Sequence, residues 1–63
     1  MKFLTIEDGK TVLYTWQKSN GTYYRKPVLE GKAKRINSAD FWAAHSAART
    51  RIKQYFEVVE NDR

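Results

Sequence analysis

Cysteine is absent from this chain of 63 residues, and histidine and proline each occur only once. Without cysteine the chain can form neither a disulfide nor a thiolate metal site. A single histidine excludes a histidine-rich metal centre, so we expect no metal and no cofactor. Long apolar runs are also missing, because Glu7 and Asp8 end the apolar start after about four residues, too few for a signal peptide. No stretch is long enough to span a membrane, and we expect a soluble, cytoplasmic protein.

Catalytic signatures are missing as well. The sequence has no glycine-rich phosphate loop, no metal-ligand spacing and no paired carboxylates. His45 falls on an apolar stripe, and no residue supplies the orienting acid that a catalytic triad needs. A domain of this size also leaves little room for a pocket. We therefore predict no catalytic residues and a protein that is not an enzyme.

The positive charge is concentrated in one segment. The formal net charge is +5, and residues 10–35 hold seven basic side chains against the single acid Glu30. Aromatic residues lie among these cations, namely Tyr14, Trp16, Tyr23 and Tyr24. Cations displace counterions from phosphates and rings stack on bases, so this composition is typical of a nucleic-acid-binding surface.

Two dipeptides organise the first half of the chain. Asp8-Gly9 and Asn20-Gly21 favour two-residue hairpin turns, in which both central positions need positive φ. They predict antiparallel strands at about 2–7, 10–18 and 22–28, with residues 32–36 as a short fourth strand or a basic loop. Counting outward from the turns pairs Leu4 with Leu13 and Trp16 with Arg25.

The second half predicts one helix. Asn37 is a good N-cap, and Ile36 and Phe41 have the spacing of a hydrophobic staple. With no Gly or Pro in residues 38–60, we expect a helix over about 38–59. Its apolar stripe comprises Phe41, Ala44, His45, Ala48, Ile52, Tyr55, Phe56 and Val59. The fold class is therefore α+β, a single domain over 1–63, with a sheet of hairpins over about 2–36 packed on one C-terminal helix.

One helix can cover only one of the two sheet faces. One face carries Leu4, Ile6 and Leu13, with Tyr24 and Lys26 beside them, and the other, the aromatic face, carries Tyr14, Trp16 and Tyr23. Because the first face is the more purely aliphatic, we expect the helix to cover it and leave the aromatic face in solvent. If the aromatic face were covered instead, the exposed aliphatic face would suit a protein partner better than phosphates.

The leading hypothesis is a small nucleic-acid-binding protein, with DNA slightly favoured over RNA. Its basic, aromatic hairpin would provide the surface, and the alternative for each ring is a place in the core. The order of a three-stranded sheet followed by one helix resembles that of the arm-type DNA-binding domains, which implies a sheet inserted into the major groove. The predicted nucleic-acid-binding residues are Tyr14, Trp16, Lys18, Tyr23, Arg25, Lys26, Lys32, Lys34, Arg35, Arg49 and Lys53.

The alternative hypothesis is a protein-interaction module. Trp42 lies beside the predicted apolar stripe, and Ala43 and Ala47 form part of a strip without charge. Small uncharged side chains let another helix approach closely, which would permit a homodimer or a protein partner. A small accessory or regulatory protein of a phage or mobile element, which docks on a host protein to inhibit or adapt it, fits this composition.

Overall fold

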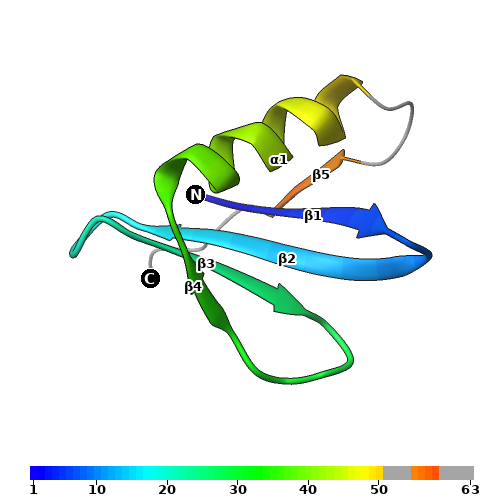
Figure 1. The fold of residues 1–63 in the computed structure, drawn as a ribbon, viewed down its shortest axis with the longest axis horizontal. Helices are drawn as coiled ribbons and strands as arrows, with labels where there is room; N and C mark the ends of the chain where they lie inside the picture. Colours follow the sequence, from blue (N-terminus) through cyan, green and yellow to red (C-terminus); the bar gives the residue numbers. More distant parts are fainter. Residues whose placement is uncertain (51–54, 59–63) are drawn as a thin grey trace.

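The computed structural model describes residues 1–50 and 55–58, and it confirms an α+β fold. In this part of the chain a five-stranded antiparallel sheet packs against a single helix, α1 (Figure 1). The strand order is β4-β3-β2-β1-β5, so the N-terminal hairpin lies in the middle. The elements are β1 (Lys2–Glu7), β2 (Lys10–Gln17), β3 (Thr22–Pro27), β4 (Lys34–Ile36), α1 (Ser38–Thr50) and β5 (Tyr55–Val58).

The first hairpin forms as predicted. Asp8 and Gly9 have φ values of 51° and 75°, the left-handed conformation that both central residues of a type I′ turn require. Glu7 therefore pairs with Lys10, and Leu4 pairs with Leu13. A two-residue turn fixed this register from the sequence alone.

The second hairpin has a longer turn than predicted. Gln17 pairs with Thr22, and the amide of Gly21 donates to the carbonyl of Gln17 at 2.8 Å, so the loop contains four residues. The Asn20 side chain accepts from the Thr22 amide at 3.1 Å and stabilises this wider turn. Trp16 consequently faces Tyr23 rather than Arg25, a register shift of two residues. A shift of two keeps each side chain on its predicted face.

The predicted start of the helix is confirmed. Asn37 Oδ1 accepts from the Asp40 amide at 2.8 Å, and the Asn37 carbonyl accepts the first helical bond from Phe41. Ile36 packs against the core that contains Phe41, as a hydrophobic staple requires. β4 leads directly into this cap, so residues 34–36 of the basic segment before the helix form a short strand, while Lys32 lies in the preceding loop.

The predicted end of the helix is wrong. α1 ends at Thr50, and Tyr55–Val58 form β5, which pairs with β1 at the edge of the sheet. Aromatic and β-branched residues favour an extended strand here, and the free edge of β1 supplies its hydrogen-bond partners. Tyr55 and Phe56 therefore belong to the sheet and not to the helical stripe. Ile52 and Val59 lie outside the described residues.

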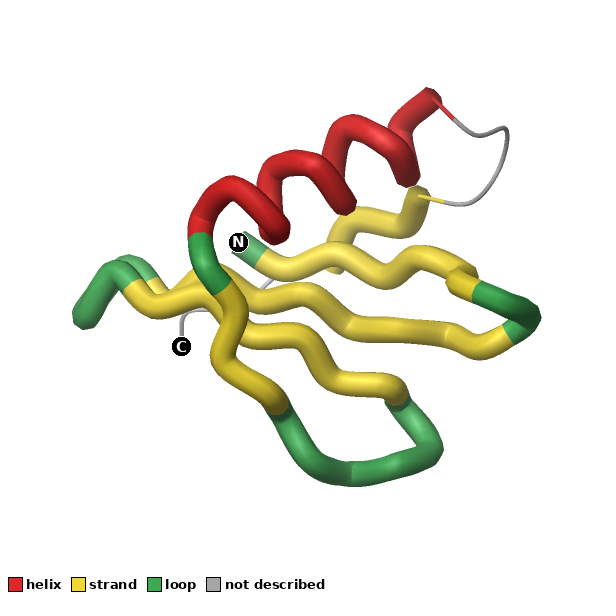
Figure 2. Tube along the Cα trace, in the orientation of Figure 1, coloured by secondary structure: helices red, strands yellow, loops and turns green. Residues whose placement is uncertain are grey.

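The predicted choice of buried face is also wrong. α1 covers the aromatic face of the sheet, and Figure 2 shows the helix lying on one side of the sheet only. Tyr14, Phe3 and Val12 are at most 4% exposed and pack with Phe41 of α1. Aromatic rings bury more area per side chain than the aliphatic residues of the other face, so this arrangement removes more apolar surface from water. We call the opposite side, which no described element covers, the open face.

Candidate interaction surface

The aromatic residues predicted to stack on bases lie mostly under the helix. Tyr14 is 4% exposed and stacks on Phe3 with ring centroids 4.9 Å apart. Trp16 and Tyr23 are half-buried, and their rings stack with centroids 6.1 Å apart. Trp42 packs edge-on against both, so it closes one end of the helix–sheet interface. Tyr14 is thus a core residue, and the rings of Trp16 and Tyr23 partly cover each other.

A hydrogen-bonded network satisfies the polar end of Tyr14. Its hydroxyl donates to Glu7, and Arg25 Nε donates to the same hydroxyl at 3.2 Å. Arg25 Nη2 also pairs with Glu7 Oε1 at 2.7 Å. Burial, followed by the hydrogen bond to Glu7, raises the pKa of Tyr14, and the hydrogen bond from Arg25 partly opposes this. The hydrogen bonds to Glu7 and Tyr14 raise the pKa of Arg25. Arg25 is therefore engaged within the fold.

The remaining predicted cations are spread over several sides of the molecule. Lys18 is exposed in the β2–β3 turn, and Lys32 is exposed in the β3–β4 loop. Arg49 lies near the end of α1, with its guanidinium carbon 5.8 Å from the Tyr55 ring centroid. Lys53 lies outside the described residues. The basic segment is continuous in sequence but does not form one continuous surface with the aromatic rings.

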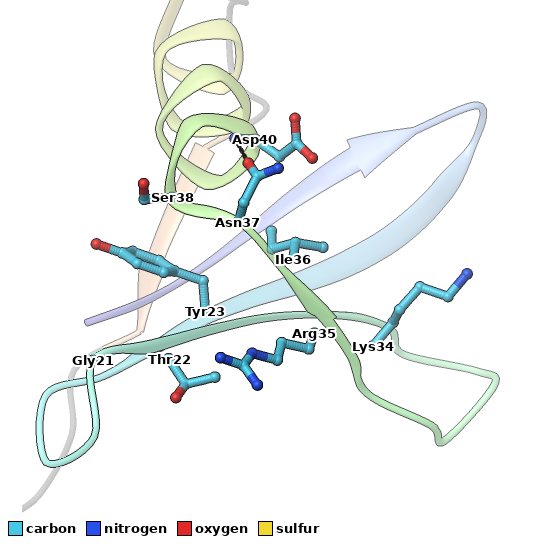
Figure 3. A pocket seen from close by; sticks show the side chains of 9 residues that line it. All are labelled: Gly21, Thr22, Tyr23, Lys34, Arg35, Ile36, Asn37, Ser38 and Asp40. Atoms are coloured by element: carbon cyan, nitrogen blue, oxygen red, sulfur yellow. Dashed lines mark hydrogen bonds between the residues drawn. The ribbon is translucent and has the colours of Figure 1, made fainter.

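A groove runs along β4 beside the start of α1. It encloses about 580 Å³ and is lined by residues 21–23, 34–38 and 40. Lys34 and Arg35 both border it, but their side chains extend to opposite sides of β4, and the Asp40 carboxylate points away from both (Figure 3). Successive side chains of a strand point to opposite faces of the sheet, which explains why these two neighbours extend in opposite directions. The two cations therefore do not converge on one anion.

The open face has a different chemistry. Cross-strand pairing places Phe56, Leu4, Leu13 and Lys26 in one row over β5, β1, β2 and β3. The neighbouring row contains Val58, Lys2, Thr15, Tyr24 and Arg35. Ile6 opposite Thr11 completes an apolar area centred on β1 and β2.

This apolar area is accessible to a partner. Phe56 is 51% exposed, and Leu4, Ile6 and Leu13 are half-buried. Val28 continues the area beyond β3, since its amide bonds the Thr11 carbonyl at 3.0 Å and its side chain is 46% exposed. The next residue, Leu29, is 96% exposed in the following turn. The open face thus presents apolar side chains from several strands to solvent.

Sequence reasoning missed the contribution of β5 to this surface. Phe56 and Val58 were assigned to the helix, although the run Tyr-Phe-Glu-Val-Val has the alternation and the residue types of a strand. Leu4 and Leu13 were assigned to the core because they are aliphatic. Tyr24 and Lys26, by contrast, were placed on the correct face.

The helix surface proposed for a protein partner is smaller. Trp42 is 43% exposed, Ala43 is exposed and Ala47 is half-buried. Part of the Trp42 ring packs on Trp16 and Tyr23, which gives this side chain a structural role within the fold. Both a structural and a binding role for Trp42 agree with this geometry.

Comparison with known proteins gives no further guide to the site. No family model matches the chain, and neither curated proteins nor solved structures provide a match. The resemblance to arm-type DNA-binding domains is therefore carried no further. Among residues 1–50 and 55–58 there is no cluster of side chains suited to hold a metal ion. Within the same ranges no helix has the length and apolar character to cross a membrane.

Proposed function

We propose that this protein is an interaction module that binds a partner protein through its open face. The observation that supports the proposal is the apolar area of Leu4, Leu13 and Phe56 on a sheet face that no described element covers. Exposed apolar areas on small proteins are typical of protein–protein contacts. Arg35 and Lys26 at the border of this area would accelerate association with an acidic partner.

The nucleic-acid hypothesis stays a prediction, and the arrangement of its residues in the fold supports it less than the composition did. The aromatic rings that this hypothesis uses lie in the core or in the helix–sheet interface, and Arg25 is paired with Glu7. Tyr24, Lys26 and Arg35 remain on the open face and would suit phosphates. A test of the proposed function must therefore separate a protein partner from a nucleic acid.

The test compares two variants in capture experiments from nuclease-treated lysate of the cells that naturally produce the protein. Leu4→Thr combined with Leu13→Thr makes the open face more polar and introduces β-branched residues, which favour strands. Trp42→Ala is the matched control, since it removes an exposed ring from the helix side. We expect the first variant to lose a stoichiometric protein that the wild type and the Trp42 variant retain.

Three other outcomes would contradict the proposal. Loss of all captured material on nuclease treatment would support nucleic-acid binding. Loss with the Trp42 variant alone would place the contact on the helix. Equal capture by all three proteins would show that neither surface is used. Circular dichroism of each variant establishes that the fold is retained before the comparison is made.

A further inference from the structure

The open face is mainly apolar over β5, β1 and β2 and mainly basic over β3 and β4, with Lys2 of β1 as the exception. Its strand positions on β5, β1 and β2 include Phe56, Leu4 and Leu13, whereas those on β3 and β4 include Lys26 and Arg35. Adjacent strands are about 4.8 Å apart, so the centre of the mainly apolar part lies roughly 10–15 Å from Arg35. A matching partner needs apolar and charged groups on neighbouring sides of one element.

The charge on the open face has one sign. Among the described strand positions on this face, the charged side chains are Lys2, Lys26 and Arg35, and no carboxylate occurs there. A second copy placed face to face would bring these cations opposite either cations or apolar side chains, and no strand position of this face would supply a carboxylate to pair with them, which is unfavourable in a desolvated contact. Charge complementarity therefore favours an acidic partner over a copy of this chain.

The width of the face suits a helix. A helix with its side chains is about 10–12 Å across, comparable with two to three strand spacings. On the other side of the same sheet, α1, with 13 residues, covers the aromatic core on its own. One helix of similar length is thus sufficient to cover a face of this sheet.

Resting on the proposed function, we infer that the partner element is an acidic amphipathic helix. Its apolar stripe packs over Leu4, Leu13 and Phe56, and its acidic flank lies over Lys26 and Arg35. A helix with apolar residues at spacings of three and four and with glutamates on one side has both features. The orientation places the acidic flank toward β4 and not toward β5.

Designed peptides provide a direct test. The first peptide carries a leucine stripe with a glutamate flank, the second has the same stripe with a lysine flank, and the third is a shuffled form of the first without a stripe. Fluorescence anisotropy measures binding to the whole chain, and circular dichroism measures the helicity that the peptide gains. We expect the first peptide to bind and gain helicity, with at least about tenfold weaker binding of the other two.

Neighbouring residues of β4 supply a matched control for charge. Arg35→Glu places an acid on the open face, whereas Lys34→Glu makes the same charge change on the opposite side of the strand (Figure 3). We expect Arg35→Glu to weaken binding of the glutamate-flank peptide by about tenfold or more, and Lys34→Glu to leave it within about twofold. Arg35→Glu together with Lys26→Glu should reverse the preference toward the lysine-flank peptide.

Several results would overturn the inference. Equal weakening by Arg35→Glu and Lys34→Glu would show a response to net charge alone. Equal binding of the shuffled peptide would exclude a helical stripe, and tighter binding of a DNA duplex or single strand than of any peptide would favour nucleic acid. If no peptide binds while the Leu4/Leu13 variant still loses its cellular partner, the helix inference fails and the proposed function stands. If that variant keeps both the cellular partner and the peptide, the proposed function fails as well.

Discussion

At the scale of single residues, the least expected side chain in the core is Thr5. It is 2% exposed, and its hydroxyl has no hydrogen-bond partner among the described residues. It lies between Val12 and Tyr55 across the two neighbouring strands, in apolar surroundings. A buried hydroxyl without a partner costs about 1–3 kcal/mol of desolvation, so this position lowers the stability of the fold.

We predict that Thr5→Val stabilises the protein. Valine has nearly the shape of threonine and removes the unsatisfied hydroxyl, so the free energy of unfolding should rise by about 1 kcal/mol. Thr15→Val on the open face is the control and should change stability by no more than about 0.5 kcal/mol. Urea denaturation measures both. A loss of stability in Thr5→Val would reveal a hydrogen bond to the hydroxyl.

Tyr14 makes the stability of the fold depend on pH in the alkaline range. Because its pKa is raised above the ordinary value of 10.0, the folded state favours the protonated phenol. The associated stability is fully present below the pKa of the unfolded chain and is lost as the pH rises through the raised folded pKa. We predict that Tyr14→Phe is less stable than the wild type at pH 8 and that the difference shrinks above pH 10.

Thermal unfolding over this pH range measures the effect. The comparison with Tyr14→Phe removes the contribution of the other tyrosines and of the lysines, which titrate in both proteins. A constant difference between the two proteins across the range would show that Tyr14 does not lose stability on ionisation.

At the scale of elements, the N-cap holds the junction between β4 and α1. The Asn37 side chain accepts from the Asp40 amide, and β4 ends at the residue before it. We predict that Asn37→Ala lowers the free energy of unfolding by about 1 kcal/mol, with Asn37→Asp close to the wild type. Ser38→Ala is the neighbouring control, since Ser38 is exposed inside the helix. Equal effects at both positions, measured by chemical denaturation, would assign the loss to helix propensity.

The two phenylalanines of the second half now have opposite roles. Phe41 is fully buried against Phe3 and Tyr23, whereas Phe56 is 51% exposed on the open face. We predict that Phe41→Ala costs about 3–5 kcal/mol, comparable with the whole stability of so small a domain, and that Phe56→Ala costs about 1 kcal/mol or less. Thermal unfolding by circular dichroism distinguishes them. Unfolding by Phe56→Ala would restore the assignment of Phe56 to the core.

At the scale of the whole molecule, the described fold has two layers, the helix and the sheet, and the sheet face away from the helix is exposed. α1 lies over one side of the sheet (Figure 1). It contributes few large side chains besides Phe41, and the described core consists mainly of sheet residues. The open face holds further apolar surface that remains in contact with water. Binding there would add a second apolar layer, so a partner that binds only the folded chain should also raise its thermal stability.

The sequence alone determined the local parts of this architecture. Asp8-Gly9 specified one turn and its register, and Asn37 specified the start of the helix. Alternation also assigned the residues of β1, β2 and β3 to the correct faces, even in the hairpin whose register differs by two. These features depend on neighbours within a few residues, which is why composition and spacing are sufficient to predict them.

Only the tertiary structure decided which face is buried and where the helix ends. Alternation assigns residues to two faces but does not indicate which face is buried. That depends on how much apolar area α1 covers on each face and on whether the buried polar groups find hydrogen-bond partners. Tyr14 can be buried because Glu7 and Arg25, far apart in sequence, meet its hydroxyl. Tyr55–Val58 is a strand because it pairs with β1, fifty or more residues earlier in the chain. Both outcomes rest on contacts between distant residues, and they move the candidate site from the aromatic hairpin to the open face.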